Sequence, residues 1–242
     1  MKILAIGNSY SCDGTRYLWQ IAKSAGETIT VANLVIGGCP LRKHYVNALE
    51  NAKAYDLHFN GTNTGFHVSI KEALIAHDWD VVTLQQASRD SVNFDTYVPY
   101  LDFLADQIRL YAPKAKIYIH QTWAYTEAQS QAIGFSSHAA MLQAILPAYE
   151  QAKEQISAAG MIPDGEVMGA LMACREESEV YRDAIHASYG LGRYALALTW
   201  FATLTGKALD GVTFDDFDAP VTKEQMDAAK EIVANVMASH AN

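Results

Sequence analysis

The chain has 242 residues, of which 50% are hydrophobic and 19% charged, and its formal net charge is -9 at pH 7. This composition is typical of a globular protein with one sizeable core and excludes a mainly disordered chain. The negative charge argues against nucleic acid and anionic membranes as partners, because their phosphate groups would be repelled.

Other features of the composition bear on the compartment of the protein. No segment approaches the length of a membrane span. Lys2 leads directly into an apolar run with no leader before it, which favours a cytoplasmic location, with a removed secretion leader as the alternative. Three scattered cysteines predict neither a disulfide framework nor a zinc site and favour a reducing compartment.

The first fourteen residues predict a strand, a tight turn and the start of a helix. The apolar residues 3–6 are followed by Gly7, Asn8, Ser9 and Ser11. Such a turn aims the N–H groups of a helix start at a ligand, which suits a nucleophilic serine or a phosphate site. The glycine series of nucleotide-binding loops is absent. The turn therefore favours Ser9 or Ser11 as a nucleophile, and a hydroxyl at Ser11 is also typical of a helix N-cap or turn.

Strands and helices alternate along the rest of the chain. Residues 161–163 are too few to assign as a strand, and residues 50–66 are polar and predict a surface loop that could rim a pocket. Pro147 is expected to kink or split the helix that contains it. The predicted strands cover residues 28–36, 80–84 and 116–120, and the predicted helices cover 14–25, 68–77, 101–111, 137–158, 165–175, 190–205 and a last one that starts with a capping box at Thr222.

This alternation predicts one α/β domain over residues 1–242, with a mostly parallel sheet covered by helices on both faces. Ligands of such sheets bind beyond the carboxyl ends of the strands. The Ser9 turn, the glycine pair 37–38, the glutamine pair 85–86 and the loop from Gln121 to Tyr125 all follow predicted strands. We therefore expect these four segments to meet at one edge of the sheet.

A serine nucleophile needs a base for its proton and a group that orients this base. Asp183 and His186 are three residues apart just before a buried helix, so the carboxylate can face the imidazole ring while the far ring nitrogen stays free. Taken alone, this spacing is more often a turn cap beside an ordinary histidine. The serine turn at the other end of the chain favours the catalytic interpretation.

Three segments resemble the sequence blocks of the SGNH or GDSL hydrolases and come in the order of that superfamily. They are Ile6-Gly-Asn-Ser9, with Asn8 where most members have Asp, the stretch from Asn33 to Gly38, and Asp183-x-x-His186. The resemblance covers most of the chain. It implies a three-layer, flavodoxin-like α/β/α fold with five parallel strands, Ser9 as nucleophile, His186 as base and Asp183 as the orienting carboxylate.

The resemblance also implies an oxyanion hole made by the backbone N–H groups of Ser9 and Gly38 and by a side chain of the third block. The usual Gly-x-Asn-Asp is absent there, and Gln85-Gln86-Ala87-Ser88 stands in its place. A glutamine amide can donate the same hydrogen bond from a longer stem. Gln86 is therefore the predicted third donor, with Gln85 as the alternative.

The remaining candidates concern the substrate. Gln85, Gln121, Trp123 and Tyr125 are predicted substrate contacts, because an aromatic ring can stack on a sugar, although the two aromatic residues are equally consistent with loop packing. The other histidines have no metal-ligand spacing, so neither a metal nor another cofactor is expected.

These features predict a serine esterase that hydrolyses short acyl groups, acetyl above all, from a carbohydrate or another small molecule. An esterase or thioesterase for longer acyl chains, a non-catalytic carbohydrate-binding relative and a flavodoxin-like nucleotide binder are the alternatives. The sequence indicates no oligomeric state.

Overall fold

A computed structural model describes residues 1–240 of the chain. Its seven-stranded sheet has the order β4-β3-β2-β1-β5-β6-β7. Five neighbouring strands, from β2 to β7, are parallel, and the β3–β4 hairpin is antiparallel. The strands are β1 (Lys2–Gly7), β2 (Thr30–Val35), β3 (Tyr55–Phe59), β4 (Thr62–Val68), β5 (Val81–Leu84), β6 (Lys116–His120) and β7 (Gly160–Ile162).

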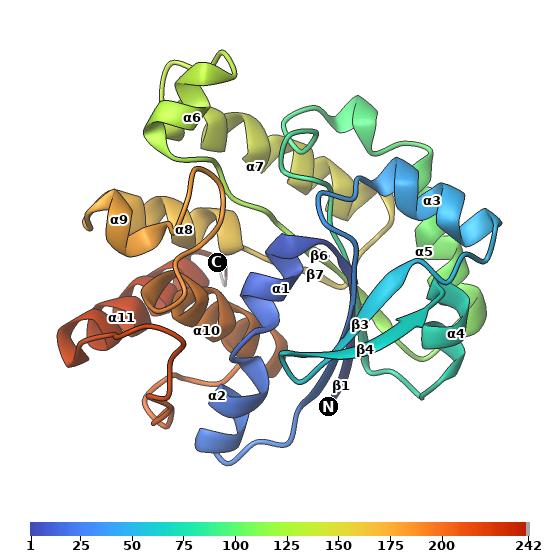
Figure 1. The fold of residues 1–242 in the computed structure, drawn as a ribbon, viewed down its shortest axis with the longest axis horizontal. Helices are drawn as coiled ribbons and strands as arrows, with labels where there is room; N and C mark the ends of the chain where they lie inside the picture. Colours follow the sequence, from blue (N-terminus) through green and yellow to red (C-terminus); the bar gives the residue numbers. More distant parts are fainter. Residues whose placement is uncertain (241–242) are drawn as a thin grey trace.

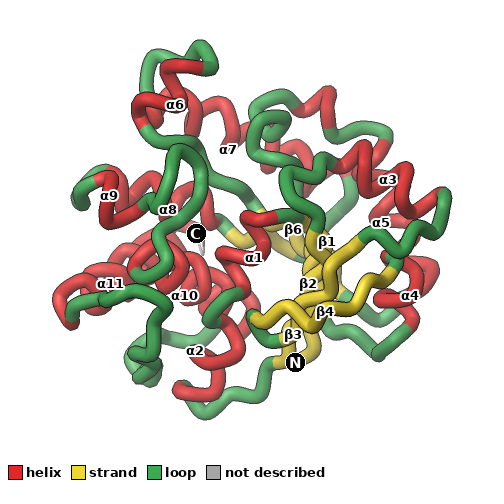
Figure 2. Tube along the Cα trace, in the orientation of Figure 1, coloured by secondary structure: helices red, strands yellow, loops and turns green. Residues whose placement is uncertain are grey.

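Helices lie on both sides of this sheet (Figures 1 and 2). On one side, α10 contacts α1, α2, α8 and α11. On the other side, α5 contacts α3 and α4. The helices are α1 (Ser9–Thr15), α2 (Leu18–Ser24), α3 (Leu41–Leu49), α4 (Ile70–Ile75), α5 (Tyr100–Tyr111), α6 (Glu127–Ala132), α7 (His138–Gln155), α8 (Asp164–Met172), α9 (Glu177–Val180), α10 (Leu191–Thr205) and α11 (Lys223–His240). The predicted three-layer α/β/α arrangement is confirmed.

The predicted count of five strands is wrong, because residues 50–66 are not a loop. They contain most of the β3–β4 hairpin, whose turn places Asn60 and Gly61 at positive φ. Strand β3 pairs with β2, and β4 forms the exposed edge of the sheet. An edge strand with one solvated face and few apolar residues lacks the continuous hydrophobic run that identifies a covered strand.

Two helix predictions also need correction. The helix predicted over 14–25 is two helices, α1 and α2, and α1 starts at Ser9 itself. The hydroxyl of Thr15 bonds back to the carbonyl of Ser11 at 2.7 Å, a contact that bends helices, and α1 ends at this residue. Pro147 does not split α7, since it lies on the exposed side of that helix, where water can satisfy the freed carbonyl.

The core is continuous around the central strands and α10. Strand β1 is buried from Ile3 to Gly7, and β5 is buried throughout. Helix α10 buries eleven of its fifteen residues, as its apolar sequence predicts. Within residues 1–240, no helix is both long and apolar enough to cross a membrane.

Candidate active site

The turn after β1 places Ser9 at the first position of α1. Asn8 caps this helix, because its Oδ1 accepts the backbone N–H of Tyr10 at 2.9 Å. Only glycine fits at position 7, since a Cβ there would lie 2.4 Å from Gln85 Oε1 and 2.6 Å from Ser11 Oγ. Ser9 itself is partly exposed, whereas Asn8 and Ser11 are buried. The turn thus presents the Ser9 hydroxyl at the carboxyl end of β1.

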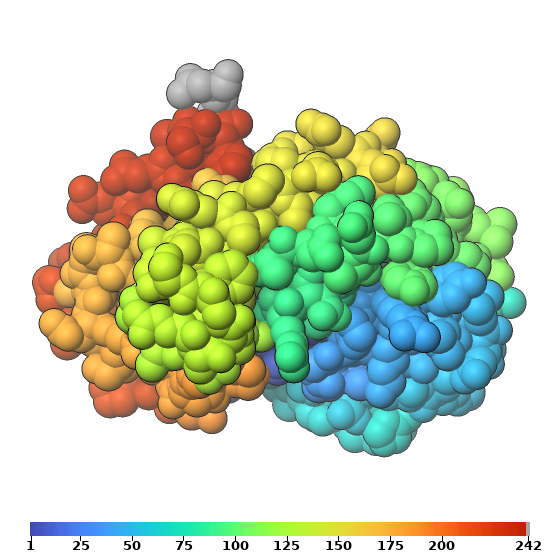
Figure 3. All heavy atoms as spheres, turned by 90° about the horizontal axis from the view of Figure 1, so that it is seen from above, coloured from blue at the N-terminus to red at the C-terminus, as the bar shows by residue number. Residues whose placement is uncertain are grey.

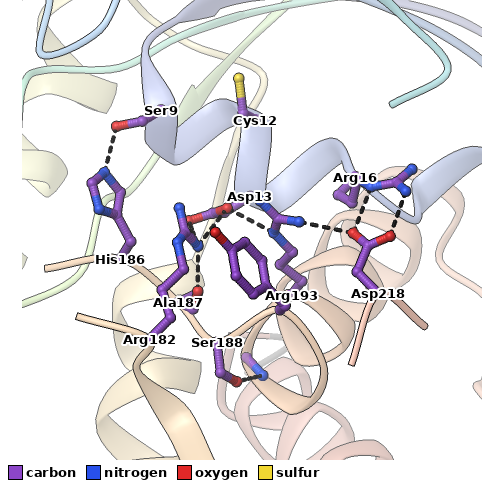
Figure 4. A network of polar contacts seen from close by, with 12 residues as sticks. Ser9, Cys12, Asp13, Arg16, Arg182, His186, Ala187, Ser188, Arg193 and Asp218 are labelled. Atoms are coloured by element: carbon purple, nitrogen blue, oxygen red, sulfur yellow. Dashed lines mark hydrogen bonds and ion pairs between the residues drawn. The ribbon is translucent and has the colours of Figure 1, made fainter. Parts of the chain in front are cut away.

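Three side chains from opposite ends of the chain form a hydrogen-bonded series. Ser9 Oγ lies 2.9 Å from His186 Nε2 (Figure 4). His186 Nδ1 lies 2.9 Å from Asp183 Oδ2. This is the geometry in which a histidine removes the proton of a serine while a carboxylate fixes its tautomer. The structure brings together the three residues that the sequence indicated.

Asp183 is held as a carboxylate at this site. Partial burial alone would raise its pKa, but the backbone N–H groups of Ile185 and His186, at 2.9 and 2.8 Å from Oδ1, and the His186 ring outweigh this effect and lower the pKa. The same two N–H groups close the turn on which Asp183 and His186 lie. One carboxylate therefore shapes the turn and faces the imidazole.

An ion cluster centred on the buried carboxylate of Asp13 fixes this turn to α1 (Figure 4). Asp13, on α1 and 0% exposed, accepts hydrogen bonds from Arg182 at 2.8 Å and from Arg193 at 2.8 Å. Arg193 also binds Asp218, which pairs with Arg16 at 2.5 Å. Arg182 further donates to the carbonyl of Ala187. The cluster joins the segment that carries His186 to the helix that carries Ser9.

Two stacked aromatic rings also bind the turn of residues 183–186. The rings of Tyr10 and Trp123 lie 3.9 Å apart and are nearly parallel. Tyr10 Oη and Trp123 Nε1 both donate to the carbonyl of Ile185, at 2.7 and 3.0 Å. Ile185 directly precedes His186, so these two bonds limit the position of the imidazole.

The loop after β2 brings Gly38 beside the Ser9 turn. Asn8 Nδ2 donates to the carbonyl of Cys39 at 3.3 Å, and the N–H of Ile36 donates to the carbonyl of Gly7. Gly38 is exposed and has φ +62, and within residues 1–240 its N–H has no hydrogen-bond partner. The loop that carries Gly38 thus lies beside the Ser9 turn, and an oxyanion hole made by the Ser9 and Gly38 N–H groups stays a prediction.

The structure does not place Gln86 in that hole. Its Nε2 donates to the carbonyl and the hydroxyl of Thr96, and its Oε1 accepts the N–H of Leu41 at 2.9 Å. Both amide hydrogens are therefore already used, and the side chain joins the start of α3 to the 3-10 helix Phe94–Thr96. The alternative, Gln85, is 2% exposed and donates to Asn8 Oδ1 at 2.8 Å, so its amide hydrogen-bonds to the cap of α1 within the protein interior.

The predicted substrate contacts are also corrected. Gln121 and Trp123 are 0% exposed, and Gln121 Oε1 accepts the N–H of Glu166 while Trp123 stacks on Tyr10. Gln85 is buried as well, and Tyr125 is 6% exposed with its hydroxyl 3.0 Å from Ser88 Oγ. The amide and aromatic groups of these loops are therefore buried and bound to other parts of the protein. The sequence did not reveal this, because their partners lie far away in the sequence.

The surface around the turn is formed by segments from several parts of the chain. From above, the dark-blue start of the chain reaches the surface between orange, green and light-blue segments (Figure 3). In the part of the chain that the structure describes, no group of three histidine, cysteine or acidic side chains is placed to hold a metal.

Sequence reasoning missed Asp13, Arg182 and Arg193, which form a cluster in which both arginines bind the buried carboxylate of Asp13. It also missed His120 and Asp164, which form a buried pair 2.8 Å apart behind the site. The helix expected from the sequence begins at residue 14, so Asp13 lies outside it and its burial cannot be read from a helical pattern.

Comparison with known proteins shows which family the chain belongs to. The sequence profile described as "Domain of unknown function (DUF4886)" matches residues 2–235. The chain belongs to the DUF4886 family. A crystal structure of a DUF4886 family protein from Bacteroides uniformis shares 29% identity and superposes with a TM-score of 0.90, covering 98% of this chain and 94% of that one. A comparison with curated protein sequences gives no match.

Solved structures also place this DUF4886 member in the SGNH hydrolase fold. A protein from Slackia heliotrinireducens, described as "a putative SGNH hydrolase", has a TM-score of 0.61 at 22% identity, covering 84% of this chain and 98% of its own. A carbohydrate esterase of family 3 from Talaromyces cellulolyticus has a TM-score of 0.57 at 14% identity, with 85% and 97% covered. The resemblance found in the sequence blocks is confirmed at the level of the fold.

Proposed function

We propose that this DUF4886 protein is a serine esterase that removes short acyl groups, acetyl above all, from a carbohydrate. The observation that carries the proposal is the series Ser9–His186–Asp183, with 2.9 Å between Ser9 Oγ and His186 Nε2. The carbohydrate esterase from Talaromyces cellulolyticus, which has the same fold, supports the substrate class.

The chemistry follows from the positions of these groups. Ser9 Oγ attacks the ester carbonyl carbon while its proton passes to His186 Nε2, and the Ser9 and Gly38 N–H groups stabilise the oxyanion. The bond to the alcohol then breaks, and His186 returns the proton to the leaving oxygen. Water, activated by His186, releases the acid from the acyl-enzyme. Asp183 stabilises the imidazolium in both steps.

The preference for short acyl groups rests on the packing beside the catalytic histidine. The Tyr10 ring lies 5.9 Å from the His186 ring and is covered by Trp123, and Tyr125 is bonded to Ser88. These aromatic side chains are at most 6% exposed, so they offer little surface on which a long acyl chain could pack.

A series of p-nitrophenyl esters tests the activity and the acyl length together. We expect kcat/KM to be highest for acetate, with release of acetate from acetylated xylan as a second readout, and Ser9→Ala to lose at least about 1000-fold. Ser136→Ala, which changes an exposed serine, is the matched control and should retain full activity. Activity that peaks at octanoate would contradict the acetyl preference, and hydrolysis that survives Ser9→Ala would contradict the mechanism.

A further inference from the structure

A buried series of hydrogen-bonded polar side chains runs from the start of α8 to the cap of α1. His120, at the end of β6, contacts Asp164 Oδ2 through Nε2 at 2.8 Å and Gln85 Oε1 through Nδ1 at 2.9 Å. Gln85 Nε2 then donates to Asn8 Oδ1 at 2.8 Å, and Trp200 Nε1 donates to Asp164 Oδ2 at 2.9 Å. His120 and Asp164 are both 0% exposed.

Backbone groups at one end of this series determine where its protons lie. The N–H of Tyr10 can only donate and the carbonyl of Cys39 can only accept, so Oδ1 of Asn8 is the acceptor and its Nδ2 the donor. The atom of Gln85 that faces Asn8 Oδ1 must then be its NH₂ group. Its carbonyl oxygen is left facing the imidazole of His120. His120 Nδ1 must therefore carry a hydrogen.

This assignment restricts the buried pair at the other end of the series. With Nδ1 protonated, the contact between His120 Nε2 and Asp164 Oδ2 needs one more proton, on either atom. Both arrangements leave the pair neutral overall, which suits a site without water. Burial also raises the pKa of Asp164, against the opposing effect of its bonds to His120 and Trp200.

We propose that His120 is a positioning residue of the esterase, which acts as an obligatory Nδ1–H donor to Gln85 and thereby fixes Asn8. This inference rests on the proposed function. Asn8 caps the helix that begins at Ser9 and holds the Gly38 loop through the Cys39 carbonyl. One buried donor thus sets the position of the nucleophile relative to the proposed oxyanion hole. Gln85, which belongs to the segment that stands in place of the usual third block, connects His120 to Asn8.

The same series of hydrogen bonds also explains why Asn stands at position 8, where the SGNH hydrolases usually have Asp. A carboxylate in place of the Asn8 amide would still accept the bonds from Tyr10 and Gln85. Its second oxygen would face the carbonyl oxygen of Cys39 instead of donating to it. Asn8→Asp is therefore expected to lower kcat by about tenfold or more, although it restores the common residue of the superfamily.

Two substitutions of His120 separate the contacts of its ring. The Nδ2 of an asparagine replaces Nδ1 and can still donate to Gln85, whereas the Nε2 of a glutamine replaces Nε2 and serves only Asp164. For p-nitrophenyl acetate we expect His120→Gln to lower kcat about 100-fold with KM unchanged, and His120→Asn to lower it about tenfold. Each variant loses one ring contact, so their thermal stabilities should fall by similar amounts. Equal kcat losses in the two variants would overturn the proposal.

A second readout does not depend on esterase activity. In the wild-type protein labelled with ¹⁵N-histidine, the His120 ring, identified by its loss in His120→Asn, should show a slowly exchanging proton on Nδ1. A bare Nδ1 overturns the role of His120 even in an active enzyme. If the Nδ1 proton is present but wild type hydrolyses no ester, the proposed function has failed, and with it the role of His120 in catalysis.

Discussion

Single residues carry the chemistry of the site. The carboxylate of Asp183 binds two backbone N–H groups and the His186 ring, so it controls both the turn and the tautomer. The sequence was enough to single out Ser9, Asp183 and His186, which the structure brings within hydrogen-bond distance of one another, because a serine turn followed later by an Asp-x-x-His pair is typical of serine hydrolases. It was not enough for Gln85 and Gln86, whose amides could reach many groups and in the fold bind partners far away in the chain.

Asp183→Asn is expected to lower kcat for p-nitrophenyl acetate by about 1000-fold or more. An amide in this position can donate to the His186 ring and so favours the wrong tautomer. Because the pKa of Asp183 is lowered, the wild-type side chain is a carboxylate at pH 7, where the two rates are compared. Asp216→Asn, at an exposed position, is the control, and a loss in Asp183→Asn no larger than in this control would argue against the role of the carboxylate.

Gly38→Ala tests the proposed backbone donor of the oxyanion hole. Alanine at φ +62 costs about 1 kcal/mol, and we expect the loop to relieve this strain by a backbone rotation that turns the N–H away from the site. We expect kcat to fall about tenfold or more. Gly37→Ala is the matched control, since a Cβ is free of contacts at both positions and Gly37 has no positive φ. Equal rates for the two variants would remove Gly38 from the hole.

At the scale of elements, the site depends on how α1 and the segment 181–190 are joined. The longer parallel strands and most of the helices could be predicted, because their hydrophobic patterns have the period of a strand or a helix. Strand β7, with three residues, was too short to assign, and α3 was not predicted. The β3–β4 hairpin could not, since β4 exposes six of its seven residues and has no apolar face. The ion cluster around Asp13 could not either, because nothing local indicates which of the arginines it meets.

Asp13→Asn should destabilise this junction. It leaves Arg182 and Arg193 without the buried carboxylate that both bind, at a cost of about 3 kcal/mol in the free energy of unfolding. Asp218→Asn, at the outer end of the same cluster, should cost about 1 kcal/mol or less, because its charge is screened by water. Urea unfolding measures both values. A larger loss for Asp218→Asn would contradict the importance of the inner pair.

At the scale of the whole molecule, a buried histidine couples the stability of the fold to pH. His44 is 0% exposed, and its Nδ1 lies 2.8 Å from the hydroxyl of Tyr55 in the hairpin. Burial, with a smaller contribution from Lys43, lowers its pKa from 6.5 to about 3. The folded protein therefore keeps His44 neutral at pH values where the unfolded chain is protonated.

The free energy of unfolding should thus fall as the pH falls. The contribution of His44 is fully present above pH 6.5 and is lost between 6.5 and about 3, with a slope of about 1.4 kcal/mol per pH unit. Urea unfolding at pH 7, 6, 5 and 4 measures this slope. In His44→Asn the slope of the free energy of unfolding against pH should be smaller by about 1.4 kcal/mol per pH unit, the contribution of one proton, whatever the absolute stability of the variant. Equal slopes in the two proteins would show that His44 is not held neutral.

Covalent labelling tests the central claim about Ser9 most directly. The protein is treated with a fluorophosphonate, which reacts with activated serines, and the modified peptide is identified by mass spectrometry. We predict one label, on Ser9, in the wild-type protein and in Ser136→Ala, and none in His186→Ala. A wild-type protein that stays unlabelled, or a label on another serine, would contradict the account.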